Sequence, residues 1–164
     1  MAMEKAIQDY YPEDVSYCYG CGSLNDHGLH IKSYWDGEVS TARFVPQPYH
    51  IAIPGYVYGG LIASLIDCHC VGTAAAALYQ EEGRDQGSEP AIRCLTASLH
   101  VDYLKPTPLG VELEIRAKVK EVNGRRVTVT ASVYAGDLES ARGEVVAVQI
   151  PDRYFERLSG AKPD

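Results

Sequence analysis

Apolar and polar residues alternate through most of the second half of the chain. Apolar side chains occupy every second position of residues 95–103, and the same period recurs over residues 111–120. A period of two is typical of β-strands, and the charged residues between the apolar positions of the second segment predict one buried and one solvent-exposed face. Further strands are predicted over residues 39–45, 127–134 and 141–150.

The predicted strands are separated by residues that favour reversal of the chain. Asn123-Gly124 is a strong hairpin signal, and Gly136-Asp137 predicts a second turn. Strand ends are predicted by Pro46, Pro48, Pro106, Pro108 and Gly110. The second half of the chain is therefore predicted to form an antiparallel meander.

Residues 60–79 follow a different pattern, in which apolar side chains lie on nearly every side of a helix. A helix of this kind is enclosed rather than surface-lying. Asp67 at its middle would cost about 2.5–3.5 kcal/mol in a bilayer, so we predict a helix buried within the protein. One long helix beside consecutive strands indicates an α+β fold, with an antiparallel sheet covered by a single central helix.

The length of 164 residues and the hydrophobic fraction of 46% suit one packed domain. We assign residues 1–16 to a polar N-terminal leader, residues 17–151 to the domain and residues 152–164 to a C-terminal tail. The net charge of −7 argues against general nucleic-acid binding, which requires a basic surface. The first residues lack the pattern of a secretory signal and the five cysteines are an odd number, so we expect reduced thiols and a cytoplasmic location.

Asp67 is the most informative candidate for chemistry. It is the only acidic residue between Glu38 and Glu81, and it lies within the apolar helix, where an unpaired carboxylate is costly. Burial raises the pKa of a carboxyl group, and such perturbed acids cluster at active sites. The alternative is a carboxylate that faces water or is held by neighbouring backbone and has no catalytic role.

Gly59 and Gly60 precede Asp67 by two helical turns. The free N–H groups at the start of a helix carry positive partial charge and could stabilise an oxyanion. A glycine pair also permits a tight turn from strand to helix, and this structural role alone would explain the presence of both glycines. Together with the acid seven residues after Gly60, the pair suggests a polarised carbonyl and an activated water in one pocket.

Three segments resemble the hot-dog thioesterases of the PaaI type. Residues 54–67 read PGYVYGGLIASLID and are similar to the family's G-x-V-H-G-G motif with an acid seven residues after the second glycine. Residues 18–29 resemble the C-x-x-C-G-x-x-N-x-x-G-L opening of one branch, and residues 96–110 resemble its T-x-x-L-x-V-x-Y-x-x-P-x-P-L-G strand. The three segments occur in order between residues 17 and 150, which makes the resemblance fairly specific.

The resemblance implies a five- or six-stranded sheet wrapped around the helix, in a homodimer or homotetramer. It implies hydrolysis of a thioester of coenzyme A or of acyl-carrier protein, with coenzyme A as part of the substrate and no cofactor. Asp67 occupies the position of the family's catalytic carboxylate. Gly59 occupies the position whose backbone N–H polarises the thioester carbonyl, and Thr96 occupies a position where some relatives have a Ser or Thr that positions water. The further site residues are His50 and Tyr58 in catalysis and Gly60, Ser64 and Lys105 in substrate binding.

Two positions depart from the family pattern. Tyr58 replaces the histidine that usually precedes Gly-Gly, and Ala52 stands where some relatives have asparagine. Tyrosine donates hydrogen bonds but is not a base near neutral pH. This leaves a second hypothesis, a non-catalytic acyl-CoA-binding or interaction module of the same fold. A hot-dog dehydratase is a third, although the sequence has no histidine-containing hydratase motif.

Two cysteine-containing segments suggest other chemistry. The first is a C-x2-C-x5-H-x2-H cluster that consists of Cys18, Cys21, His27 and His30. These residue types bind zinc, but the middle spacing is far shorter than in a zinc finger, and we predict no bound metal. In the second, Cys68 and Cys70 flank His69, but adjacent helical residues point in different directions and do not form a Cys–His pair.

Overall fold

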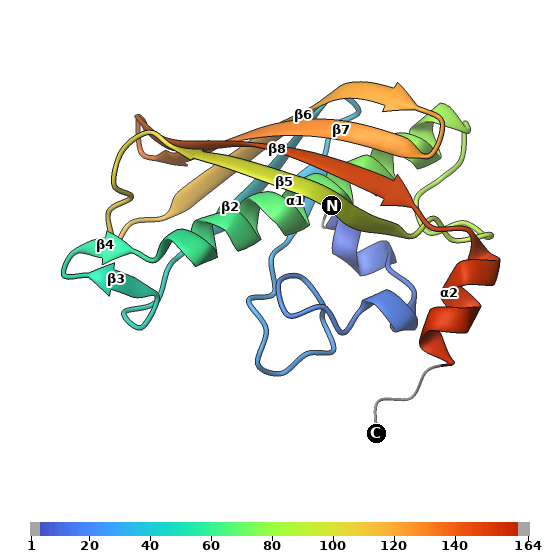
Figure 1. Ribbon diagram of the computed structural model, residues 1–164, viewed down its shortest axis with the longest axis horizontal. Helices are drawn as coiled ribbons and strands as arrows, with labels where there is room; N and C mark the ends of the chain where they lie inside the picture. The colour runs from blue at the N-terminus through green and yellow to red at the C-terminus, as the bar shows by residue number, and fades with distance from the viewer. Residues whose placement is uncertain (1–3, 161–164) are drawn as a thin grey trace.

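The computed structural model describes residues 4–160, in which a six-stranded sheet curves around one long helix (Figure 1). In chain order the elements are two 3-10 helices, Ile7–Tyr10 and Glu13–Val15, then β1 (Ser33–Trp35), β2 (Val39–Phe44), β3 (Ile51–Ile53), β4 (Tyr56–Val57), α1 (Gly59–Glu81), β5 (Cys94–Tyr103), β6 (Leu113–Asn123), β7 (Arg126–Ala135), β8 (Leu138–Gln149) and α2 (Asp152–Ser159). The sheet order is β1-β2-β6-β7-β8-β5, every neighbouring pair is antiparallel, and β3 pairs separately with β4. The predicted α+β fold is confirmed.

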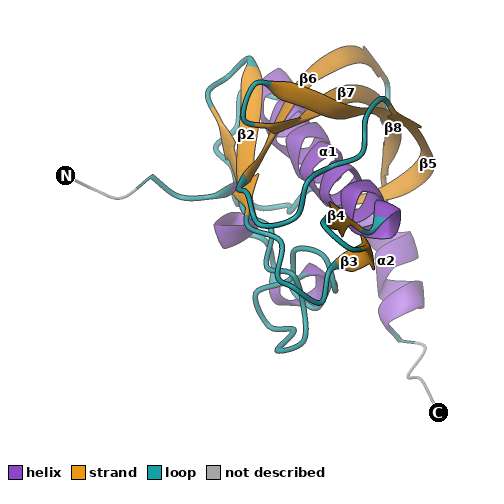
Figure 2. Cartoon of the chain, turned by 90° about the vertical axis from the view of Figure 1, so that its left-hand side faces the viewer, coloured by secondary structure: helices purple, strands orange, loops and turns teal. Residues whose placement is uncertain are grey.

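The central helix α1 lies between the sheet and the N-terminal segment (Figures 1 and 2). Leu65 and Ile66 are completely buried, and Leu61 nearly so, in one core with the inner faces of β6, β7 and β8. In the described part of the chain α1 is the one helix long and apolar enough to cross a membrane, but 78% of its apolar window is buried inside the protein. This burial agrees with the prediction of an enclosed helix.

Gly143 on β8 allows the sheet to approach α1 closely. A Cβ atom added at this position would lie 2.6 Å from Cγ2 of Ile66 and 3.0 Å from the carbonyl oxygen of His100. Carbon atoms in contact are normally about 3.5–4.0 Å apart. Glycine is therefore the residue that fits between β5, β8 and the helix.

The N-terminal residues pack more tightly than a polar leader would. Ala6, Ile7 and Gln8 are buried. The Gln8 side chain accepts a hydrogen bond from the Ser33 backbone N–H at 2.8 Å and donates one to the Ser33 hydroxyl at 3.2 Å. Ala6, Ile7 and Gln8 thus pack into the domain. The polar sequence did not indicate this, because a buried glutamine is tolerated once its amide is hydrogen-bonded.

Residues 152–159 of the expected C-terminal tail form α2. Within it, the Phe155 ring lies 4.9 Å from the guanidinium carbon of Arg93, at the start of the domain's edge strand. This helix and the short strands β1, β3 and β4 were not predicted, because segments of two to eight residues carry too few positions to show a period.

His69 on α1 is fully buried among hydroxyl groups of the first two strands. Its Nδ1 lies 2.7 Å from Oγ of Ser33, and its Nε2 lies 3.1 Å from Oγ of Ser40. Thr73 donates a hydrogen bond to the His69 carbonyl oxygen at 2.7 Å. The imidazole therefore ties the helix to β1 and β2, and its ring nitrogens are not directed at the neighbouring cysteines.

We expect the free energy of unfolding to fall as the pH drops from 6.5 to about 4. Burial lowers the pKa of His69 from its ordinary value of 6.5 to about 4, so within this window the unfolded chain binds a proton that the folded protein excludes. Within this window the free energy of unfolding changes by at most about 1.4 kcal/mol per pH unit, and it is fully recovered above the pKa that His69 has in the unfolded chain. Urea denaturation at several pH values should show a shallower slope for His69→Gln, and equal slopes would contradict this role.

Candidate active site

Asp67 of α1 and Thr96 of β5 are brought together in the structure. The Thr96 hydroxyl donates a hydrogen bond to Oδ1 of Asp67 at 2.6 Å. Burial raises the pKa of the Asp67 carboxyl group, and the hydrogen bond from Thr96 partly offsets this effect. A hydroxyl donor fixes the orientation of the carboxylate without neutralising its charge. A carboxylate that activates water or attacks a carbonyl needs both its orientation and its charge.

Asp67 and Thr96 line a cavity of about 310 Å³ between α1, the beginning of β5 and the N-terminal segment. Its apolar wall consists of Tyr11, Val15, Val71, Ala75, Ile92, Leu95 and Phe155. A mostly apolar cavity with a few polar groups at one point is typical of a small-molecule site. The carboxylate is therefore placed beside a space that suits a hydrocarbon group.

The first turn of α1 forms a second polar region. Tyr58 is the N-cap residue, and its ring lies across Gly60, where a Cβ atom would approach ring atoms to 2.4–2.6 Å. Tyr103 of β5 donates its hydroxyl to the Gly59 carbonyl oxygen at 2.7 Å. Sequence reasoning did not single out Tyr103, although it is the tyrosine of the T-x-x-L-x-V-x-Y pattern.

The start of the helix and Asp67 are too far apart to act on one carbonyl group within a single chain. Gly59 precedes Asp67 by eight residues, and a rise of about 1.5 Å per residue separates them by about 12 Å along the helix axis. The expected single pocket with both groups is therefore not formed by the backbone of one chain alone.

The remaining predicted site residues lie near the first turn of α1 or at the end of β5. The His50 carbonyl oxygen accepts a hydrogen bond from the Tyr58 N–H at 2.9 Å, while the His50 ring accepts one from a backbone N–H of its own turn. Ser64 donates to a carbonyl oxygen one helical turn earlier, and Lys105 is exposed just beyond β5. Within residues 4–160 none of the three is hydrogen-bonded to the carboxylate–hydroxyl pair, and their roles stay predictions.

Cys18, Cys21 and Cys68 converge on the same cavity. Their sulfur atoms all lie within 4.8 Å of one another, and those of Cys18 and Cys68 are 3.8 Å apart. Hydrogen bonds from the other two thiols lower the pKa of Cys18, and the hydrogen bond to Cys18 raises the pKa of Cys21 to about 12. The hydrogen bonds within the cluster therefore favour Cys18 over Cys21 and Cys68 as the thiol that loses its proton, and Cys18 lines the same cavity as Asp67.

The two histidines of the predicted zinc cluster are directed elsewhere. Nε2 of His30 lies 2.5 Å from the Asn25 carbonyl oxygen, and the His27 backbone N–H donates to the Asn25 side chain. In the described residues the cysteines are grouped with Cys68 of α1 instead. The C-x2-C-x5-H-x2-H arrangement is therefore not assembled as a four-residue site.

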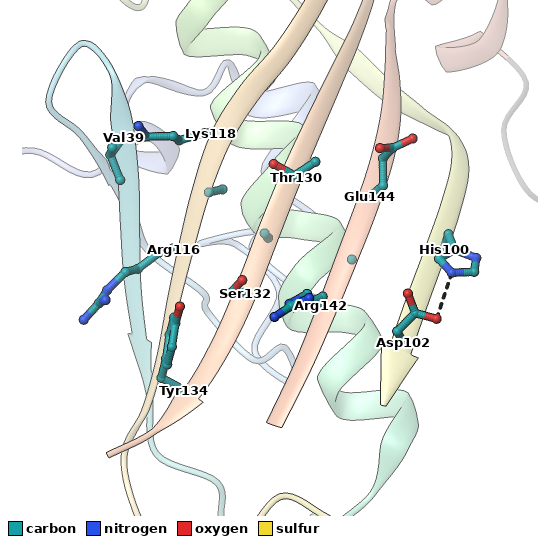
Figure 3. A pocket seen from close by; sticks show the side chains of 13 residues that line it. Val39, His100, Asp102, Arg116, Lys118, Thr130, Ser132, Tyr134, Arg142 and Glu144 are labelled. Carbon is teal, nitrogen blue, oxygen red and sulfur yellow. Dashed lines mark hydrogen bonds and ion pairs between the residues drawn. The ribbon is translucent and has the colours of Figure 1, made fainter. Parts of the chain in front are cut away.

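A larger hollow of about 650 Å³ lies on the outer face of the sheet (Figure 3). Its charged side chains are spread over several strands and engaged in exposed ion pairs, such as Arg142 with Glu139 at 2.7 Å and Lys118 with Glu38 at 3.1 Å. Exposed pairs of this kind contribute little energy, and these side chains do not converge on one point. The smaller cavity beside Asp67 is therefore the candidate active site.

The fold agrees with the outcome of comparison with known proteins. The sequence model of the Thioesterase superfamily matches residues 54–142, from the approach to α1 into β8. The chain belongs to this superfamily, and its architecture is the hot-dog fold.

Individual relatives support the same assignment. A thioesterase superfamily protein of known structure from Shewanella loihica PV-4 is 48% identical, with a TM-score of 0.63 over 77% of this chain and 96% of that one. Acyl-coenzyme A thioesterase THEM4 from Xenopus laevis is 35% identical over 107 residues, which are 65% of this chain but 42% of that protein. The PaaI protein of E. coli, at 14% identity and a TM-score of 0.62, shares the fold over 75% of this chain and 81% of its own. The chain thus spans less than half the length of the curated THEM4 relatives that it matches.

Proposed function

We propose that this protein hydrolyses an acyl-CoA thioester to the free acid and coenzyme A. The observation that carries the proposal is the 2.6 Å hydrogen bond between Thr96 and Asp67 beside an apolar cavity. The THEM4 proteins of Xenopus laevis and Rattus norvegicus, which match this chain over 107 and 104 residues, are named acyl-coenzyme A thioesterases. Coenzyme A belongs to the substrate, and the proposal includes no cofactor.

All five cysteines are free thiols, which suits the proposed cytoplasmic location.

In the proposed reaction Asp67 removes a proton from a water molecule as the water oxygen attacks the thioester carbon. The C–S bond then breaks, and the departing sulfur of coenzyme A takes the proton from the Asp67 carboxylic acid. The Thr96 hydroxyl holds the carboxylate throughout. Direct attack by Asp67, which gives a mixed anhydride that water then hydrolyses, uses the same geometry.

A second copy of the chain is part of this proposal. β5 is an edge strand of the sheet, and its residues Leu95, Leu99 and Tyr103 are exposed. Unpaired edges with apolar side chains favour pairing with another chain. We propose a homodimer or homotetramer in which β5 lies against its copy, so that the Gly59 N–H of one chain acts with Asp67 of the other.

We expect light scattering at micromolar concentration to give a dimer or a tetramer. Leu99→Lys, which places a charge at the β5 edge, should shift the protein toward monomer and lower any thioesterase activity, with the circular dichroism spectrum unchanged. Leu138→Lys, at an exposed leucine beside the turn between β7 and β8, is the matched control. A wild-type protein that is monomeric and fully active would contradict a shared site.

The alternative function, a non-catalytic acyl-CoA-binding module, is favoured by Tyr58 in the place of the family's histidine. A panel of short, medium, long and aromatic acyl-CoAs separates the two. An enzyme releases free thiol, which a chromogenic disulfide reagent detects, whereas a binding module retains the intact thioester. Retention without thiol release across the panel would replace the proposed function with the alternative. Because the cavity wall is mostly apolar, we expect hydrocarbon acyl groups to be preferred over charged ones.

A further inference from the structure

The cysteine cluster has no part in the proposed hydrolysis, yet its residues come from distant parts of the chain. Cys18 and Cys21 belong to the N-terminal segment, and Cys68 lies on α1, fifty residues after Cys18. Their convergence depends on Gly20, where a Cβ atom would lie 2.2 Å from the Cys68 sulfur. Only a residue without a side chain allows the loop to approach the helix this closely.

The distances within the cluster are those of sulfur atoms around one metal ion. Zinc binds thiolate sulfur at about 2.3 Å, so two sulfurs of a tetrahedral site lie about 3.8 Å apart. The Cys18 and Cys68 sulfurs are 3.8 Å apart, and all three pairs lie within 4.8 Å.

The loop that carries the first two cysteines has a suitable backbone. The loop is closed by a hydrogen bond from the Gly22 N–H to the Cys18 carbonyl oxygen at 2.7 Å. This turn holds Cys18 and Cys21 at the C-x-x-C spacing that is common among zinc ligands.

We propose that Cys18, Cys21 and Cys68 bind one zinc ion through three thiolates, which replaces the prediction, made from the sequence alone, that no metal is bound. The three cysteines also line the cavity that contains Asp67 and Thr96, so a fourth position of a tetrahedral ion would be open to water. Three protein ligands and one open position are sufficient for a stable zinc site. The ion would fasten the N-terminal segment to α1 immediately beside the candidate catalytic carboxylate.

The test uses the full chain, reduced and freed of metal by dialysis against a chelator. Zinc is then titrated in competition with a chromogenic chelator, and cobalt is titrated as a spectroscopic probe. We expect one equivalent of each ion to bind, and the cobalt complex to show sulfur-to-metal charge-transfer bands together with the visible bands of tetrahedral coordination.

Serine variants of the three cysteines identify the ligands. Cys18→Ser, Cys21→Ser and Cys68→Ser should each weaken zinc binding by more than the roughly 10–100-fold typical of losing an outer-shell partner, because each removes a direct ligand. Cys94→Ser is the matched control, since Cys94 lines the same cavity but lies outside the cluster. His30→Ala should also bind normally, which distinguishes this site from the cysteine–histidine arrangement.

Several outcomes would overturn the proposal. The wild-type protein could fail to bind one equivalent of zinc, or its cobalt complex could lack the thiolate bands. Zinc binding could persist unchanged in Cys68→Ser, or be lost in His30→Ala. Mass spectrometry of the reduced, metal-free protein checks that all three thiols are free at the start of the titration, and circular dichroism checks that each variant is folded.

Discussion

Asp67→Asn is expected to lower the turnover number on the best acyl-CoA substrate by about 10²–10⁴-fold, the range typical of general-base catalysis. The amide has nearly the shape of the carboxylate and can still accept the hydrogen bond from Thr96, but it cannot take a proton from water or attack a thioester. The Michaelis constant should change much less than the turnover number, because the cavity wall is unaltered. Steady-state thiol release measures both quantities.

The stability of this variant provides an independent readout. Because burial raises the pKa of Asp67, the ionised form is disfavoured in the folded protein above the ordinary pKa of the group, and removing it should leave the melting temperature at pH 7 unchanged or higher. Asp102→Asn, at an exposed carboxylate on the same edge strand, should leave turnover unaffected. Unchanged turnover in a folded Asp67→Asn protein would exclude both catalytic roles proposed for this residue.

Gly143→Ala is expected to destabilise the protein by about 1–3 kcal/mol, the usual effect of adding a carbon to a fully packed core. The new methyl group would lie 2.6 Å from Cγ2 of Ile66, and the backbone of β5 blocks its displacement on the other side. Urea denaturation should show a lower midpoint with the slope unchanged.

A double-mutant cycle with Ile66→Ala tests whether this contact is the cause. Shortening Ile66 removes the atoms nearest to the new methyl group, so the cost of Gly143→Ala should be smaller in the Ile66→Ala background than in the wild type. Strictly additive costs would show that the destabilisation arises from the strand and not from its contact with the helix.

The central helix and its carboxylate could be predicted because both depend on local sequence. An apolar run that contains one acid is visible without a structure, and so are the turns at Asn123-Gly124 and Gly136-Asp137. The pairing of Thr96 with Asp67 followed only from a family resemblance, since the two residues are 29 positions apart and no local pattern links them.

The cysteine cluster and the exposed edge strand could not be predicted for different reasons. Cys18 and Cys21 were grouped with histidines nearby in sequence, but the fold brings Cys68 to them through a contact that only Gly20 permits. The alternation along β5 resembles that of a strand with one buried face, whereas most of its side chains are exposed on both faces. The alternation of apolar and polar residues indicates that a strand has two different faces. It does not indicate whether those faces are covered by the same chain or by another one.

Four successive residues of α1 contact four different parts of the protein. Asp67 is bonded to β5, Cys68 approaches the N-terminal loop, His69 is bonded to β1 and β2, and Cys70 is buried in the core. Consecutive helical residues point about 100° apart, at 3.6 residues per turn, so these contacts surround the helix at the level of the carboxylate. Neither rotation nor sliding of α1 can occur without breaking at least one of them.

The direction of the carboxylate is thus set by the folded protein, so in the proposed hydrolysis no reorganisation energy is spent on turning it toward the substrate. The cavity wall is built differently, since Val15 and Phe155 come from terminal segments and Leu95 from the sheet edge. In the proposed function, the acyl group that is accepted can therefore change through substitutions in the wall while the Asp67 carboxylate keeps its position. Selection or engineering for a new substrate would act on those peripheral residues and leave the helix intact.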